Sequence, residues 1–295
     1  MAIFVTGDTH GANRFGTWDI NGYKTRFSKE SFPEQKTLTK DDYVIICGDF
    51  GGVWLSNRTA YEEPESEKKD LDWLENRNFT TLFVPGNHEN YDRLTGCKDE
   101  KLLNSWFYKN MPDEEKDKLR KGYPKKRWHG GTVRQIRPSI LMLDHGVFDI
   151  AGNPVLCVGG ASSHDIHDGI LYPYDFKDET SFEKTYRLMY KLGRQIRVSG
   201  ISWWKQEVPE KSFEKKIINA LTKKSDTVHF VFSHDAPSSD VAMLGYSERN
   251  RLNTFMEDLK SFVTYGHWFF GHYHDNRTLP GGKDHLLYEQ IVQID

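Results

Sequence analysis

The stretch "AIFVTGDTHG", from Ala2 to Gly11, is an apolar run that stops abruptly on glycine, aspartate and histidine. A short run of β-branched and aromatic residues predicts a β-strand, and one too apolar to alternate predicts a strand buried on both faces. The pattern recurs in six further runs: "DYVIICGD", "TLFVPGN", "SILMLDHGVFDI", "PVLCVGG", "TVHFVFSH" and "HWFFGHYH". These runs predict a buried sheet as the scaffold of the protein.

Helical patterns separate several of the predicted strands. We expect helices within residues 63–78, 181–196, 212–224 and 247–262, and each of the last three opens on Ser before a Glu. Alternation of buried strands with helices predicts an α/β layered architecture. No repeat or Pro/Gly/Ser-rich linker divides the chain, so we expect a single domain over residues 1–295. Insertions are expected at about 110–131 and 162–200.

The composition excludes several classes of protein. With 37% apolar and 28% charged residues the chain is an ordinary globular one, and a net charge of −3 gives no overall field for nucleic acid or an anionic membrane. No apolar run approaches the roughly 18 residues of a membrane span, and the N-terminus resembles a core strand rather than a signal peptide. Three widely spaced cysteines argue against a disulfide framework, so we expect a cytoplasmic protein.

Polar side chains follow five of the predicted strands at the points where the strands end. They are Asp8, His10, Asp49, Asn87, His88, His234, His272 and His274, and four of the five runs place a glycine directly before the first polar group. Sites in α/β sheets assemble beyond the carboxyl ends of strands, and glycine allows a sharp turn or the close approach of a ligand. We therefore expect these side chains to gather at one rim.

Such a gathering of oxygen and nitrogen donors indicates bound cations. Asp and His side chains packed together without partners would cost on the order of several kcal/mol of desolvation. The donors are carboxylates, imidazoles and one amide, with no thiolate. This set suits Mn²⁺, Fe²⁺/Fe³⁺, Zn²⁺ or Co²⁺ better than a structural zinc site or a calcium cage.

Taken in order, "GDTHG", "GD", "GNHE", a strand-terminal His and "GHYH" resemble the motifs of the calcineurin-like metallophosphoesterase superfamily. The resemblance spans Asp8 to His274 and implies a four-layer α-β-β-α sandwich of two mixed sheets flanked by helices. It also implies three sets of metal ligands: Asp8, His10 and His274 for a first ion, Asn87, His234 and His272 for a second, and Asp49 between the two. The position of His88 implies a general acid for the leaving group.

The implied activity is hydrolysis of phosphomonoesters or phosphodiesters. Two metal ions together with two carboxylates and a bridging hydroxide leave a net positive charge, which favours a phosphate ester, and the hydroxide is the expected nucleophile. His88 would protonate the departing oxygen. We expect Mn²⁺ and/or Fe at the site, with Zn²⁺, Co²⁺ or Ni²⁺ as further candidates. The expected substrate is a small molecule, a nucleotide or a phosphoprotein.

The chain departs from the superfamily at its second motif. Many members carry Gly-Asp-x-x-Asp-Arg-Gly there, whereas this chain has Gly52 and Val53 in place of the second Asp and the Arg. What orients His88 instead is left open by the sequence, with a backbone carbonyl as one possibility, and Arg14 and Arg93 are candidate substrate contacts. The absent Arg tilts the expectation slightly toward diesters. "GDFGGVW", "GNHENYDRL", "VGGASS", "GISWWKQE" and "SHDAP" resemble a bacterial and phage branch.

Other interpretations remain open from the sequence. Seven Lys or Arg residues between Lys116 and Arg127 could meet nucleic-acid phosphates, although a solvated loop is favoured. A second metal site is one interpretation of residues 164–168, and an ordinary polar loop is the favoured one. A metal-binding regulatory or nucleic-acid-binding module with weakened catalysis, or a nuclease, is the alternative to a phosphoesterase acting on small substrates.

Overall fold

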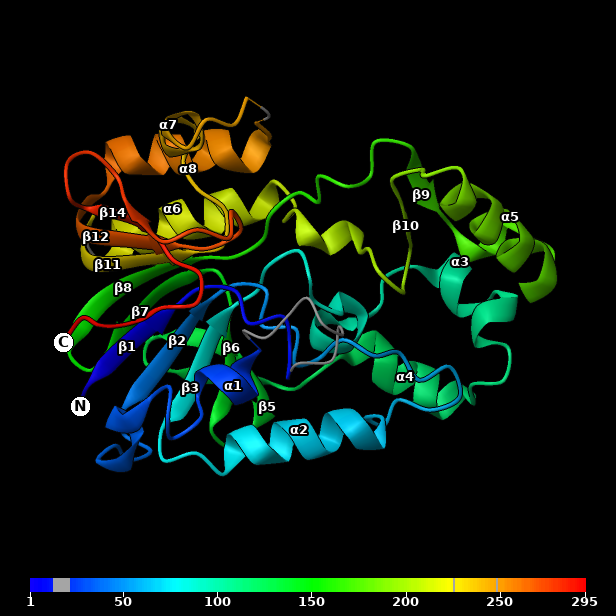
Figure 1. Cartoon of the computed structure of the whole chain (residues 1–295), viewed down its shortest axis with the longest axis horizontal. Coiled ribbons are helices and arrows are strands. Elements are labelled where there is room, and N and C mark those ends of the chain that lie inside the picture. Colours follow the sequence, from blue (N-terminus) through cyan, green and yellow to red (C-terminus); the bar gives the residue numbers. More distant parts are fainter. Residues whose placement is uncertain (13–21, 225, 248) are drawn as a thin grey trace.

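The protein is built around two large mixed sheets that face each other, as the computed structural model shows (Figure 1). The structure describes residues 1–12, 22–224, 226–247 and 249–295, so Arg14 lies outside the described residues. The first sheet has seven strands, in the spatial order β15 (Ile291–Gln293), β1 (Ile3–Thr6), β2 (Tyr43–Cys47), β3 (Thr80–Val84), β6 (Ile140–Leu143), β5 (Gly131–Arg137) and β4 (Lys125–Trp128).

The second sheet has six strands, and a separate pair of strands lies at one end of the molecule (Figure 1). The order in the second sheet is β13 (Arg277–Thr278), β14 (Asp284–Leu286), β12 (Thr264–Phe270), β11 (Thr227–Ser233), β8 (Asn153–Val158) and β7 (Gly146–Ile150). The separate pair is β9 (Gly169–Leu171) and β10 (Ile196–Val198), which run parallel.

Helices cover the outer faces of both sheets. The α-helices are α1 (Tyr23–Arg26), α2 (Glu65–Glu75), α3 (Glu100–Leu103), α4 (Asp113–Lys121), α5 (Glu179–Lys191), α6 (Ser212–Lys224), α7 (Ser238–Met243) and α8 (Arg251–Phe262). Shorter turns are η2 (Pro33–Lys36), η3 (Asp92–Gly96), η4 (Trp106–Tyr108), η5 (Pro173–Asp175) and η6 (Lys205–Glu207). In Figure 1, α1 and α2 lie against the first sheet, and α6, α7 and α8 against the second. The four-layer sandwich is therefore confirmed.

The central strands β1, β2, β3 and β6 of the first sheet are buried on both faces, as their composition predicted. In β2, Val44 and Ile46 pack in the cluster beneath the helices of the first sheet, whereas Ile45 and Cys47 pack in the cluster between the two sheets. The inter-sheet cluster also takes Phe232 and other residues of the second sheet. Because both sheets contribute to this core, we infer one domain. No helix among the described residues is long and apolar enough to cross a membrane.

Two helices begin at capping side chains rather than at the Ser residues used to predict them, whereas α6 begins at Ser212 as predicted. The predicted start of α5 at Ser181 is corrected to Glu179, because the Asp178 side chain accepts a hydrogen bond from the Ser181 N–H. In the same way, α8 begins at Arg251, because Asn250 is its N-cap. Ser181 lies two residues inside α5, whereas Ser247 lies before the cap of α8.

Candidate metal centre

The predicted ligands meet where parallel strands of the two sheets end. Strands β1, β2 and β3 are parallel neighbours in the first sheet, and β8, β11 and β12 are parallel neighbours in the second. Parallel strands end at the same edge, so the polar segments that follow them lie side by side. The carboxylate of Asp8 joins the two edges: it lies 3.7 Å from His234 Nδ1 and accepts the His272 backbone N–H at 3.0 Å.

Asp8, His10 and His274 form the first of two groups of side chains that could hold a metal ion. The Nε2 atom of His274 lies 3.1 Å from Asp8 Oδ2, and the Nε2 atoms of His10 and His274 face each other at 2.9 Å. Tyr288 stacks on the His274 ring, with 4.6 Å between ring centroids. Two ring nitrogens facing each other beside a carboxylate are arranged as ligands of one cation would be.

The second group consists of Asp8, Asp49 and His234, all buried. The Nε2 atom of His234 lies 3.2 Å from Asp49 Oδ1 and 3.1 Å from the side-chain oxygen of Asn87. The His272 ring lies against that of His234, with 4.9 Å between centroids. The predicted ligands are thus close together, and Asp8 belongs to both groups.

Asp49, the predicted bridging ligand, also contacts both groups. Its Oδ2 lies 3.9 Å from His10 Nδ1, on the opposite side from its contact with His234. Burial alone would lower the pKa of His234, but Asp49 and Asp8 outweigh burial and raise it to about 10. Burial would raise the pKa of Asp49 and Asp8, but the charge of His234 lowers both. A proton on His234 therefore balances buried negative charge that cations would balance when bound, and the residues fit a metal site.

The backbone at the rim adopts a conformation that costs energy. His10, Asp49, His272 and His274 have φ angles of 47°, 44°, 71° and 49°. Residues with side chains seldom adopt this left-handed region, and each instance costs on the order of 1–3 kcal/mol. Strain of this kind clusters at functional sites, where the surrounding structure maintains it.

Glycines allow the carboxylates to approach the neighbouring backbone. A Cβ atom at Gly86 would lie 2.1 Å from Asp49 Oδ1, and one at Gly271 would lie 2.1 Å from Asp8 Oδ1. Both distances are far shorter than any real contact, so a larger residue at either position would displace a carboxylate. At these two positions glycine therefore serves the close approach of a carboxylate from the protein itself.

His88 lies beside the ligands and contacts Arg197, a residue that was not predicted. The backbone N–H of His88 donates to Asp49 Oδ1 at 2.7 Å, and its ring stacks on Trp54. Arg197 Nη2 lies 3.1 Å from His88 Nε2 and, because a guanidinium only donates, Nε2 is the acceptor. Burial, with a further contribution from Arg197, lowers the pKa of His88 to about 3 despite Asp49. The group that contacts the His88 ring, which the sequence left open, is thus an arginine side chain rather than a backbone carbonyl.

Asp165 holds Arg197 in place. Arg197 Nε and Nη2 donate to the two carboxylate oxygens of Asp165 at 2.6 and 2.8 Å, and Nη1 donates to the Ser202 carbonyl at 2.8 Å. A two-point ion pair of this kind fixes the plane of the guanidinium. Both residues belong to the segment 162–200, which the sequence predicts to be an insertion, and they are 32 positions apart in the sequence, so no local motif indicated them.

The segment after β8 supports the Asn87 ligand. The Asn87 amide nitrogen donates to Ser163 Oγ at 3.4 Å, and the Ser163 N–H and O–H both donate to the Glu207 carboxylate at 2.8 Å. Glu207 is buried, and burial raises its pKa to about 7. This chain directs the amide nitrogen of Asn87 away from His234 and leaves the amide oxygen facing it. It also gives a structural reason for the "VGGASS" and "GISWWKQE" segments.

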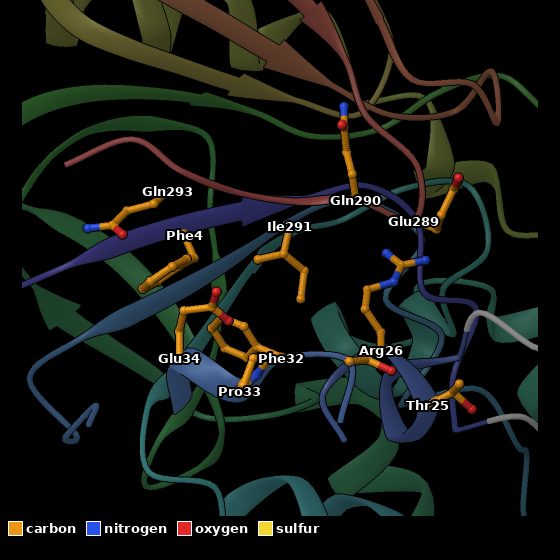
Figure 2. A pocket seen from close by; sticks show the side chains of 11 residues that line it. Phe4, Thr25, Arg26, Phe32, Pro33, Glu34, Glu289, Gln290, Ile291 and Gln293 are labelled. Carbon is orange, nitrogen blue, oxygen red and sulfur yellow. The ribbon is translucent and has the colours of Figure 1, made fainter. Parts of the chain in front are cut away.

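A buried arginine, Arg26, holds the backbone of the turn that carries Asp8. Arg26, at the end of α1, donates to Thr6 Oγ1 at 2.9 Å and to the carbonyls of Gly7 and Asp8 at 2.8 and 2.7 Å. Figure 2 shows Arg26 rising toward residues 289–291, beside a separate cavity of about 430 Å³. Arg26 therefore fixes the turn that presents Asp8 to the rim.

A cavity of about 850 Å³ opens over the rim. Predicted site residues in its lining are Asp49, Asn87, His88, His272 and His274, and the remaining lining comes from residues 162–164, 167, 195, 235, 245–247, 249–250, 253 and 273. Arg93 is not part of the lining. It is buried and forms an ion pair with Glu67, so its guanidinium serves the interior rather than a substrate.

The alternative metal site at residues 164–168 does not form. Asp165 pairs with Arg197, and Asp168 pairs with Arg194 at 2.9 Å, so both carboxylates are already neutralised. In the part of the chain that the structure describes, the two groups around Asp8 are the only metal-binding clusters of Asp, Glu, His and Cys found. His164 and His167 nevertheless line the cavity, so this polar loop borders the site.

The fold and the ligand groups define an α/β protein with metal-binding capacity at the rim of a double sheet. A family model described as calcineurin-like phosphoesterase matches residues 1–276, and the chain belongs to this family. The family uses a binuclear metal centre, and metal-dependent phosphoester hydrolysis is its general chemistry. No curated protein matches the chain. The chain is similar to a solved phosphopantetheinyl hydrolase from Mycobacterium tuberculosis, with 13% identity over 97% of this chain and 88% of that chain and a TM-score of 0.37, a level that says nothing about substrate.

Proposed function

We propose that the protein is a binuclear metal-dependent hydrolase that acts on phosphoesters. The observation that carries this proposal is the convergence of two metal-binding groups that share Asp8, at the rim of a cavity of about 850 Å³. Sites of catalysis are typically concave and carry a few convergent polar groups. Membership of the calcineurin-like phosphoesterase family supports the same chemistry.

The proposed ligands divide between two ions as the family resemblance implies. Asp8, His10 and His274 would hold the first, Asn87, His234 and His272 the second, and Asp49 would lie between them. When bound, two such ions would neutralise phosphate charge and lower the pKa of a water molecule enough for it to attack phosphorus near neutral pH. His234 would give up its proton on metal binding, because a ligating imidazole must be neutral. Mn²⁺ and/or Fe are the proposed metals.

His88 is the proposed donor of a proton to the leaving oxygen. It lines the cavity, and its backbone is fixed to Asp49. With a pKa of about 3 the free ring is neutral near pH 7. The proton that it would donate must therefore be taken up when a negatively charged phosphate group enters, since an added anion raises the pKa of a nearby imidazole.

The test combines metal analysis with turnover on one sample. Protein stripped with a chelator and reloaded with Mn²⁺ should bind about two ions per chain and hydrolyse p-nitrophenyl phosphate or bis-p-nitrophenyl phosphate. Asp49→Asn should lose metal and turnover, whereas Asp41→Asn, an exposed carboxylate after η2, should retain both. Full metal occupancy without turnover of either ester would contradict the enzyme and favour the binding module.

A cytoplasmic location is proposed on the state of the cysteines. Cys47, Cys97 and Cys157 are all buried free thiols. Free thiols are the usual state in a reducing compartment, whereas secreted domains convert cysteines into disulfides.

A further inference from the structure

The segment 162–200 supplies a cation beside His88. The second motif of this chain lacks the Arg that many relatives carry. Gly52 and Val53 occupy the positions at which many relatives carry Asp and Arg. Arg197 does not itself line the cavity, but from β10 it reaches His88, which does: its Nη2 lies 3.1 Å from His88 Nε2, and 11% of its side chain is exposed. Burying a charged guanidinium costs free energy. The burial of Arg197 beside a histidine that lines the cavity therefore points to a role at the site.

We propose that Arg197, held by Asp165, is the phosphate-binding residue of this site and the residue that positions His88. This inference rests on the phosphoesterase function proposed above. A planar guanidinium presents paired donors that match phosphate oxygens, and it keeps its charge at any physiological pH. Asp165 fixes that plane through two hydrogen bonds, so little side-chain freedom is lost when a phosphate binds.

The donors of Arg197 leave room for a ligand. A guanidinium has five N–H groups. Two of them go to Asp165, one to the Ser202 carbonyl and one to His88. One Nη1–H therefore has no partner among the described residues, and the N–H given to His88 can pass to an incoming phosphate oxygen. Asp165 and Ser202 would hold the guanidinium in place during that exchange.

Before a phosphate binds, the same hydrogen bond positions His88. Because Nε2 accepts from Arg197, the proton of the neutral ring lies on Nδ1. Trp54 stacks on the ring, with 5.7 Å between centroids, and restricts its tilt. Arg197 and Trp54 together replace the carboxylate that orients this histidine in relatives with the complete motif.

Arg197 also changes the expected substrate class. A phosphomonoester carries three non-bridging oxygens and a charge of about −2 near pH 7, whereas a diester carries two such oxygens and one negative charge. The additional oxygen and charge of a monoester are what a fixed guanidinium recognises. The slight tilt toward diesters, which rested on the absent motif-two Arg, is therefore reversed in favour of monoesters.

The experiment compares two arginines of the same insertion. Arg197→Gln in Mn²⁺-loaded protein should weaken the binding of inorganic phosphate, measured by calorimetry, by about 10- to 100-fold. The kcat/KM for p-nitrophenyl phosphate should fall by a similar factor, and that for bis-p-nitrophenyl phosphate by less. Arg194→Gln removes a more exposed arginine that pairs with Asp168, and it should leave all three values within about twofold of wild type. Arg197→Lys should recover only part of the phosphate affinity.

Asp165→Asn is a second variant, made in case Arg197→Gln does not fold. It keeps the shape of the Asp165 side chain but removes its charge, and so weakens the ion pair that holds Arg197. Metal content and melting temperature show whether each variant is folded. Wild-type phosphate affinity in folded Arg197→Gln would overturn the inference, as would equal losses for monoester and diester. If Arg197→Gln does not fold, wild-type phosphate affinity in folded Asp165→Asn would overturn the inference. Wild-type protein that turns over neither ester refutes the proposed function, while the phosphate-binding comparison still decides the role of Arg197.

Discussion

The two predicted insertions of the chain, residues 110–131 and 162–200, differ in what their charged side chains contact. In the segment 110–131, α4 carries basic residues that pair with local acids: Lys118 with Glu115, and Arg120 with Glu100 and Asp117. In the segment 162–200, the Asp165–Arg197 pair reaches inward to His88. One insertion neutralises its charges at the surface, and the other places a charge beside the candidate site.

This difference shows that charge density in a sequence does not locate function. The basic run from Lys116 to Arg127 is the most conspicuous charged stretch in the sequence, yet exposed ion pairs neutralise part of it and contribute little energy. The segment 164–168 is an ordinary polar loop by its sequence, yet His164 and His167 line the cavity. Whether a charged side chain contributes to the site depends on where the fold places it, and not on how many charged residues are near it in the sequence.

The largest effect is expected at the junction between the 162–200 insertion and the rim. Ser163→Ala removes the acceptor of the Asn87 amide nitrogen and a donor to Glu207. Loss of a residue that orients a ligand typically costs about 10- to 100-fold in metal affinity. We expect a loss of this size at the Asn87 site in a Mn²⁺ titration against a competing chelator.

Ser162→Ala is the matched control, because Ser162 is the neighbouring residue and also lines the cavity. It should keep the wild-type affinity. Equal Mn²⁺ affinities for the two serine variants would show that the insertion is not coupled to the metal ligands, and the contrast between the two insertions would then rest on Arg197 alone.

A smaller effect is expected from pH on the melting temperature. It depends on His234 at the rim, which belongs to neither predicted insertion. His234 contacts Asp8, Asp49 and the Cys47 carbonyl, and its pKa of about 10 lies above the ordinary value of 6.5. Because the folded protein binds this proton more tightly, the resulting stability is complete below about pH 6.5 and is lost as pH rises toward 10. The melting temperature of chelator-treated protein should fall across this window.

The same proton competes with metal, so Mn²⁺ affinity should rise over the same pH range. Arg194→Gln, in the 162–200 insertion, should leave the pH dependence of melting unchanged, whereas His234→Asn should flatten it. A melting temperature that falls equally in wild type and His234→Asn would mean that other groups cause the loss of stability.

The fold and the metal ligands could be predicted because their signals are local. Asp8 comes just after a short apolar strand, and the end of that apolar run places it at the rim without any knowledge of distant residues. Arg197 could not be predicted in this way, because its partners Asp165 and His88 are 32 and 109 positions away. The start of α5 was missed for a smaller reason: the Asp178 cap lies three residues before the Ser that resembled one.

The smallest effect is expected from the basic run itself. Lys125, Lys126 and Arg127 lie on β4, an exposed strand at the edge of the first sheet. Charged side chains on such an edge oppose pairing with other chains, which explains them without a ligand. Changing all three to Gln should leave metal content and kcat/KM within about twofold of wild type.

The basic residues of β4 either oppose pairing of this edge strand with other chains or contact nucleic acid. The salt dependence of single-stranded DNA binding decides between the two roles. Contacts to several phosphates would make affinity fall steeply as salt rises. Steep salt dependence in the wild type that the triple Gln variant loses would restore the nucleic-acid interpretation. We expect both proteins to bind DNA equally weakly, and the triple variant to self-associate more readily, because removing the edge charges exposes unpaired N–H and C=O groups of β4.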